Sequence, residues 1–321
     1  MNARNAVQNL SRRGGVHVQN LSKTYPDGTR ALHGVTFDIR AGTIAGYLGP
    51  NGAGKTTTVH ILSTVIKPSC GEAQICGFDV VEERTRVRKT IGLATQDISL
   101  DWLVSVQANI DFFGQMFGLA RRDIRKESTR LLADFGLLDK RASSAWSLSG
   151  GQKRRLQLVI ALLKKPGMLF ADEPSLGLDP IAKRVLHKGL EELSISGTTI
   201  MYASNDMVDL ERLCSSVIFL NAGIVVGMGP TRSFVSEYGG GTSIAVESEK
   251  PIPQDRLQTL KRRWEIDVVS ESPLRWVEKG DESLYPGIVT WLVESGLELQ
   301  DIQIRRPTLE DAFLRLVRGI E

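Results

Sequence analysis

The residues with the clearest chemistry lie between an apolar run, Ile44 to Leu48, and a helical pattern, Val59 to Ile66. They match the spacing G-x-x-x-x-G-K-[ST], in which backbone N–H groups and a helix dipole face one phosphate group. The lysine adds a positive charge and the hydroxyl can ligate Mg²⁺. We therefore expect a nucleoside triphosphate site rather than a glycine-rich turn that binds nothing. Its predicted residues are Gly49, Pro50, Asn51, Gly52, Ala53, Gly54, Lys55, Thr56 and Thr57.

A pair of carboxylates follows a second apolar run. Met168 to Ala171 leads directly into Asp172 and Glu173, and α/β proteins place their functional side chains at the carboxyl ends of strands. A solvated acidic turn is the alternative, but the apolar run in front of the pair argues against it. We predict that Asp172 holds Mg²⁺ and that Glu173 acts as the general base on the attacking water.

A second anion-binding helix start is predicted at Ser149, Gly150, Gly151 and Gln152. Ser149 is a suitable N-cap, and the two glycines expose backbone N–H groups. An ordinary helix cap would explain the serine, but it would not call for Gly-Gly-Gln in front of the basic residues 153–155. Tyr25 stands before a turn ahead of the phosphate loop; it is either a packing residue or a ring that stacks on adenine.

Composition and charge exclude several classes of protein. The 321 residues are 41% hydrophobic and carry a net charge of +3, which is too mild to imply nucleic-acid binding. Three cysteines are an odd number without metal-type spacing, so we expect reduced thiols rather than a Cys70–Cys76 bridge. No apolar run approaches the roughly 18 residues of a membrane span, and the N-terminus lacks a signal peptide's apolar core. We expect a soluble chain.

The organisation of the chain follows from the composition of its segments. Residues 1–15 are polar and form a predicted loose arm, and residues 16–238 contain all the motifs above. Within them, a helical pattern occupies about 98–160. The glycines at 239–241 are a natural linker. Alternating strands and two helical segments then predict a small α+β domain over 239–321.

The order of these motifs resembles the ATP-binding subunits of ABC transporters. The phosphate loop, Gln96, Leu-Ser-Gly-Gly-Gln, Phe-Ala-Asp-Glu-Pro and a Gly-Leu-Asp-Pro loop follow one another over about residues 16–235. The resemblance implies an α/β P-loop ATPase fold, with a mixed sheet core, an antiparallel β subdomain and a helical subdomain. It also implies a head-to-tail dimer that binds two ATP molecules with Mg²⁺ in its interface.

The resemblance assigns a role to individual residues. Tyr25 would stack on adenine, and residues 149–151 would cap the γ-phosphate bound by the other copy. Gln96 would bind the metal or the attacking water and sense the membrane partner. Asp179 would communicate between the two sites, and the helical subdomain would receive the coupling helix of a membrane subunit.

One position departs from the family pattern. The family usually has a histidine after the strand at 199–203, and this position is Asn205 here. A charged histidine stabilises the developing negative charge of the γ-phosphate, whereas an asparagine donates only a neutral hydrogen bond. We expect hydrolysis to persist, because Glu173 is present, but to be slower. A variant of this hypothesis is pairing with a different ATPase subunit that supplies an unaltered site.

The C-terminal segment Pro307 to Leu314 resembles the extension of daunorubicin-resistance-type export subunits. We expect it to pack or to steady a dimer rather than to sense a ligand. We therefore predict the ATPase subunit of an ABC-2-type exporter, held on the cytoplasmic face of the membrane by separate permease subunits. Two alternatives stay open: an ABC ATPase acting in translation or DNA repair, and a weakly hydrolysing regulator. ABC ATPases of translation and repair usually fuse two ATPase halves or insert a long coiled coil between the motifs. The single set of motifs and the short segment between Gln96 and Ser149 therefore disfavour the first alternative. The intact Lys55, Asp172 and Glu173 disfavour the second.

Overall fold

The computed structural model describes residues 15–95, 100–249, 252–264, 266, 268–271, 273–278 and 284–318. The chain divides into two compact units, Met1–Pro230 and Thr231–Glu321. The division therefore falls before the boundary that the glycines at 239–241 suggested. The physical reason is packing, because helix α9 (Thr231–Tyr238) packs against helix α12 (Leu309–Arg318) of the second unit.

The first unit contains an antiparallel sheet of four strands in the order β2-β1-β4-β5. Along its long strands, apolar side chains alternate with polar ones, as expected for a sheet with one buried face. The turn predicted after Tyr25 is present between β1 and β2. The strands are β1 (Val16–Thr24), β2 (Arg30–Ile39), β4 (Cys70–Ile75) and β5 (Phe78–Asp79).

The central sheet of the first unit has six strands in the order β10-β9-β3-β8-β7-β6. All its pairs are parallel except the hairpin at its edge. Every residue of β3, β7 and β8 is buried, which explains why their sequences are almost entirely apolar. The strands are β3 (Ile44–Leu48), β6 (Ile91–Ala94), β7 (Met168–Asp172), β8 (Thr199–Ala203), β9 (Ser216–Asn221) and β10 (Ile224–Pro230).

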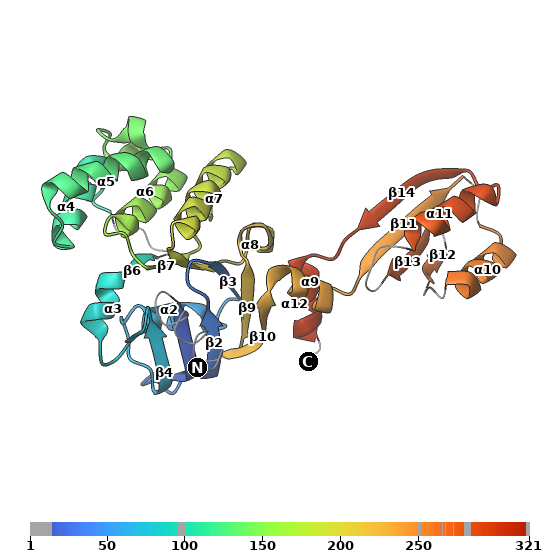
Figure 1. Ribbon diagram of the computed structural model, residues 1–321, viewed down its shortest axis with the longest axis horizontal. Coiled ribbons are helices and arrows are strands. Elements are labelled where there is room, and N and C mark those ends of the chain that lie inside the picture. Colours follow the sequence, from blue (N-terminus) through green and yellow to red (C-terminus); the bar gives the residue numbers. More distant parts are fainter. Residues whose placement is uncertain are drawn as a thin grey trace, which may run out of the picture. The chain divides into compact units, whose positions relative to one another are not determined.

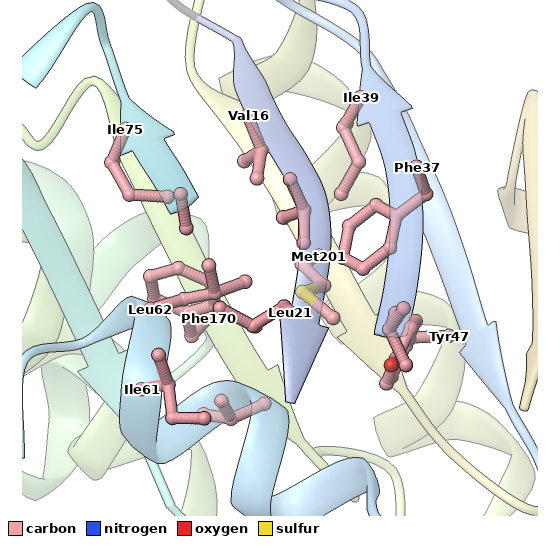
Figure 2. Packing of buried hydrophobic residues seen from close by; sticks show 14 of the residues in the cluster. Val16, Leu21, Phe37, Ile39, Tyr47, Ile61, Leu62, Ile75, Phe170 and Met201 are labelled. Carbon is pink, nitrogen blue, oxygen red and sulfur yellow. The ribbon is translucent and has the colours of Figure 1, made fainter. Parts of the chain in front are cut away.

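One hydrophobic core joins the two sheets. Figure 2 shows side chains of β1 and β2, such as Leu21 and Phe37, together with Phe170 of β7 and Met201 of β8. The ring centroids of Phe37 and Tyr47 are 5.5 Å apart. Helices α2 (Lys55–Leu62), α3 (Arg84–Thr90), α7 (Pro180–Ile195) and α8 (Met207–Leu213) complete this part of the unit (Figure 1).

The helical segment of the first unit lies between β6 and β7 in the sequence. It contains α4 (Val106–Met116), α5 (Arg121–Asp134) and α6 (Gly150–Leu162), with 3₁₀ turns at Leu138–Lys140 and Ala145–Ser147. Helix α4 begins where the Ser105 hydroxyl accepts a hydrogen bond from the Ala108 N–H. The sequence predicted a helical span of about 98–160, and α6 ends slightly beyond it, at Leu162.

The second unit contains an antiparallel sheet in the order β12-β13-β11-β14. Trp276 is fully buried in its core, which also takes side chains from α10 and α11. A capping box opens α12, because Asp311 and Thr308 exchange hydrogen bonds of 2.9 and 3.2 Å between side chain and backbone. The elements before α12 are β11 (Thr242–Ser248), α10 (Gln254–Trp264), β12 (Val268–Glu271), β13 (Leu274–Glu278), α11 (Tyr285–Glu294) and β14 (Leu299–Arg305).

Candidate active site

A cavity of about 570 Å³ lies at the carboxyl ends of three neighbouring strands. It is lined by residues 50–57 after β3, by Asp172 and Glu173 after β7, and by Asn205 after β8. Since these strands are adjacent in the order β3-β8-β7, their ends meet at one edge of the sheet. The structure thus brings the predicted phosphate loop and the predicted acidic pair together.

The phosphate loop can take its shape only with glycine at two positions. A Cβ added to Gly54 would lie 2.6 Å from the Ala31 carbonyl oxygen, and its φ of +103° is unfavourable for other residues. A Cβ on Gly49 would lie 2.1 Å from the Leu220 carbonyl oxygen. The loop backbone therefore lies directly against β2 and β9, and α2 begins immediately after it.

The ammonium group of Lys55 fixes the loop from inside. Its Nζ donates hydrogen bonds to the Gly49 carbonyl at 2.5 Å and the Pro50 carbonyl at 3.2 Å, and to Asn205 Oδ1 at 3.0 Å. Partial burial lowers the pKa of Lys55, whereas Glu173 and Asp172 raise it. The positive charge thus lies beside both carboxylates, at the place where phosphate oxygens would bind.

The backbone of Glu173 is held in an unusual conformation. Its φ is +49°, which costs a non-glycine residue on the order of 1 kcal/mol or more. Its N–H donates to the Ala203 carbonyl at 2.8 Å, and its own carbonyl accepts from Arg154 at 2.8 Å. These two bonds offset the strain and turn the side chain into the cavity.

Two neighbours bind the Glu173 carboxylate. Oε2 accepts from the Ser204 hydroxyl at 3.1 Å, and Oε1 accepts from the Asn205 N–H at 2.9 Å. Burial raises the pKa of Glu173, and these hydrogen bonds oppose the rise. Burial also raises the pKa of Asp172, against the nearby positive charge of Lys55. A carboxylate with a raised pKa is a better proton acceptor, so this environment suits a general base.

Asn205 connects three functional residues. Besides its bonds to Lys55 and Glu173, its Nδ2 donates to Asn51 Oδ1 at 3.3 Å. The side chain that stands where the family pattern has histidine therefore contacts the phosphate loop directly, and its backbone contacts the predicted base.

The predicted serine–glycine helix start is formed as a capping box. Ser149 Oγ accepts from the Gln152 N–H at 3.2 Å, and Gln152 Oε1 accepts from the Ser149 N–H at 2.9 Å. Ser149 and Gly150 are exposed, and a Cβ on Gly150 would meet no atom within 4 Å. The described residues that line the cavity belong to other segments, so residues 149–151 are not part of its wall. The two predicted anion sites of the chain are thus separate surfaces.

The remaining predicted site residues have different surroundings. The Tyr25 hydroxyl lies 3.2 Å from Thr57 Oγ1. Asp179 caps α7 by accepting from the N–H groups of Ile181 and Ala182 at 2.9 and 2.8 Å. Gln96 lies outside the described residues.

Three residues near the cavity were missed in the sequence. Ser204 binds the predicted base, Arg154 binds its backbone, and Lys183 lines the cavity while pairing with Asp206 at 2.6 Å. A serine directly after a buried strand and an arginine in the basic turn of α6 were visible in the sequence. Their distance along the chain from Glu173 concealed their role.

Known proteins resemble this chain over nearly its whole length. A family model described as "ABC transporter" matches residues 32–176. The daunorubicin resistance ATP-binding protein DrrA3 of Streptomyces coeruleorubidus is 33% identical over 311 residues, covering 94% of this chain and 95% of that protein. The Nod factor export ATP-binding protein I of Ralstonia nicotianae is 32% identical, covering 93% and 92%. The chain belongs to the ATP-binding subunits of ABC transporters.

Solved structures agree with this assignment. The ATP-binding subunit of an ABC transporter gives a TM-score of 0.64 at 26% identity, covering 70% of this chain and 93% of the other. A dimeric ATP-binding cassette in a post-hydrolysis state with ADP and Pi gives 0.62 at 26% identity, covering 68% and 99%.

The comparisons confirm several predictions for this subunit. The α/β P-loop ATPase fold, ATP binding and hydrolysis, and the likeness to export subunits are all confirmed, and the regulatory alternative is not favoured. Subunits of this family dimerise and work with membrane permeases. Among the described residues, no helix has the length and apolar character needed to cross a bilayer.

Replacing Gly54 with alanine is expected to weaken ATP binding at least about tenfold, because the new Cβ collides with the Ala31 carbonyl and reshapes the loop. Gly52→Ala is the matched control, since a Cβ there meets no atom within 4 Å although its φ is also positive. Isothermal titration calorimetry with ATP measures both variants. Equal affinities would contradict this account of the loop.

The ATPase rate is expected to fall as the pH is lowered, because protonated Glu173 cannot act as a base. Since the pKa of Glu173 is raised, this fall should begin at a higher pH than for an ordinary glutamate. Ser204→Ala removes a hydrogen bond to the ionised form, so the acid limb should move to higher pH. Ser204→Thr keeps the hydroxyl and should leave the limb in place. The pH profile of kcat measures this, and a profile unchanged by Ser204→Ala would contradict it.

Proposed function

We propose that this chain powers an ABC-2-type exporter, in which two copies drive separate permease subunits from the cytoplasmic face of the membrane. The observation that carries the proposal is the extent of the likeness. Relatives named for daunorubicin resistance and Nod factor export align with 94% and 93% of the chain, so the likeness includes the second unit. The cargo class that fits these names is a hydrophobic or amphipathic compound, a lipid or a glycan.

In the proposed dimer each ATP lies between the phosphate loop of one copy and the Ser149 helix start of the other. The separation of these two surfaces in one chain supports this arrangement. The exposed Gly150 leaves room for a phosphate to approach the N-terminus of α6, a helix of 13 residues. Because the chain carries both halves of the site intact, a homodimer is the simplest assembly.

The residues on the cavity also suit Mg²⁺. Thr56 offers a hydroxyl and Asp172 a carboxylate, and both line the cavity. Among the described residues no cluster of three or more metal-binding side chains occurs, which fits a magnesium ion bound mainly through phosphate oxygens. When bound, the ion would neutralise charge on the phosphates. Asp172 and Thr56 would hold it, and Glu173 would accept the proton of the attacking water at its carboxylate.

The other predicted site residues keep their proposed roles. Tyr25 would stack on the adenine, and its hydrogen bond to Thr57 supports a place beside the phosphate loop. Asp179 would communicate between the two sites through α7, whose N-terminus it caps. Gln96 would bind the metal or the water and sense the permease.

Asn205 is proposed to permit hydrolysis but to slow it. Its amide bonds to Lys55 and Asn51, so it stands where it can donate a neutral hydrogen bond toward the γ-phosphate. It brings no positive charge, and charge stabilisation is a large part of phosphoryl-transfer catalysis.

The ATPase rate of Asn205→His should therefore exceed that of the wild type several-fold, because a protonated histidine adds positive charge at the γ-phosphate. Glu173→Gln should lower the rate by about 10²-fold or more through loss of the base. Steady-state phosphate release in the assembled complex measures both. Full activity in Glu173→Gln, or no gain in Asn205→His, would contradict these roles.

The helical segment is the proposed docking surface for the permease. Phe112 and Met116 lie one turn apart on α4 and are both exposed. Phe112→Glu with Met116→Glu should abolish copurification with the permease and leave ATP binding unchanged. Ile195→Glu, at an exposed apolar position of α7, is the matched control. Loss of the permease in the control as well would contradict the assignment of this surface.

Affinity purification of the tagged chain from membranes of its host tests the proposed function itself. We expect a membrane protein with several transmembrane helices to copurify with the chain in a fixed ratio, and mass spectrometry identifies it. The purified complex should also hydrolyse ATP. Copurification with ribosomes or DNA instead of a membrane protein would overturn the proposal in favour of the ATPases that act in translation or repair.

A further inference from the structure

Strand β14 forms one edge of the sheet in the second unit (Figure 1). It pairs with β11 on one side, and in the part of the chain that the structure describes no strand pairs with its other side. Six of its seven residues are exposed. Ile302 and Ile304 are 40% and 41% exposed. A long, exposed edge that carries apolar side chains is suited to pairing with another strand.

The register places these two side chains on the core face of the sheet. Ile302 lies opposite Val246 and Ile304 lies opposite Ile244, and both partners on β11 are fully buried. Asp301, Gln303 and Arg305 therefore lie on the other face, because side chains alternate along a strand. Among the described residues, the apolar side of this sheet thus continues to its edge strand, where Ile302 and Ile304 remain partly exposed.

The backbone of β14 also offers hydrogen bonds outward. The Ile302 N–H donates to the side-chain oxygen Oδ1 of Asp301 at 2.8 Å, which points it toward the open side of the strand, and a pairing strand would replace this bond. In an antiparallel ladder alternate residues face the same neighbour, so the N–H groups of Ile302 and Ile304 both face away from β11.

The sequence of this edge is complementary to itself. Residues 301–305 read Asp-Ile-Gln-Ile-Arg. When two such strands run antiparallel with Gln303 opposite Gln303, each Asp301 faces an Arg305 and each Ile302 faces an Ile304. We propose that β14 pairs in this way with β14 of a second copy of this chain, about a two-fold axis at Gln303.

Such a pairing has the properties of an interface between identical subunits. One face joins four isoleucines into a continuous apolar cluster, and the other carries two ion pairs on either side of the axis. Arg305 now binds Asp311 at 3.1 Å, but its side chain is 74% exposed and can turn to the second copy. The charge pattern favours a second copy over an arbitrary strand, because an identical strand supplies both ion pairs at once.

A single strand pair buries less surface than a typical stable complex, so we expect moderate affinity alone. Its effect is larger when the same two chains also share ATP, since one contact raises the effective concentration for the other. The strand pairing needs no nucleotide. It therefore goes beyond the proposed ATP-dependent dimer and is separable from it.

Charge reversal tests the pairing in the full chain without nucleotide. Analytical ultracentrifugation should detect a dimer of the wild-type chain at concentrations up to about 0.1 mM. Asp301→Arg and Arg305→Asp each place like charges opposite one another twice, so each should weaken the dimer at least about tenfold. Mixing the two variants restores both ion pairs, as does the double variant, and both should dimerise again. A monomeric wild type, or failure of the mixture to recover, would overturn the pairing.

Cross-linking locates the axis. In a Cys70→Ser background, Gln303→Cys should form a disulfide-linked dimer on mild oxidation, because facing residues of a non-hydrogen-bonded pair lie close together. Gln300→Cys, on the same exposed strand but away from the axis, is the matched control and should not. Equal cross-linking of the two would overturn the proposed register.

A last measurement separates this inference from the proposed function. With ATP, Glu173→Gln combined with Asp301→Arg should still dimerise through the nucleotide sites. If charge-reversed chains behave as wild type without nucleotide while ATP still drives dimerisation, the strand pairing is wrong and the proposed ATPase dimer stands.

Discussion

The hydrogen bonds of the Lys55 ammonium group hold the site together. They join the start of the phosphate loop to Asn205 after β8, and they place a positive charge beside the buried carboxylate of Asp172 and the partly buried carboxylate of Glu173. The lysine therefore organises the loop before a nucleotide arrives. A phosphate oxygen must then compete with neutral carbonyl and amide acceptors, and its negative charge makes it the stronger acceptor.

The carboxylates are held at some energetic cost. Burial raises the pKa of both Asp172 and Glu173, and the backbone of Glu173 adopts a left-handed conformation. These features weaken folding slightly and are characteristic of functional sites. Here hydrogen bonds offset the strain, because Ala203 and Ser204 at the end of β8 and Arg154 of α6 all bind Glu173.

The local parts of the site could be predicted from the sequence, whereas its connections could not. Residues 49–57 and the acidic pair act through neighbouring backbone groups and a preceding strand, so their spacing carries the information. The bonds of Asn205 to Lys55 and of Arg154 to Glu173 depend on strand order and on how α6 packs. Likewise, the glycines at 239–241 marked a linker, but the packing of α9 against α12 decides which unit α9 joins.

The two units use β-strands in opposite ways. In the first unit, β3, β7 and β8 are paired on both sides and buried throughout. This packing holds the functional residues at their carboxyl ends in fixed positions. In the second unit, β14 is an edge strand of seven residues, and it contains no lysine that would discourage pairing with another strand. Proteins rarely leave such an edge without a partner. Because the charges of β14 are complementary to those of an antiparallel copy of itself, they favour pairing with a second copy of this chain and disfavour pairing with other strands.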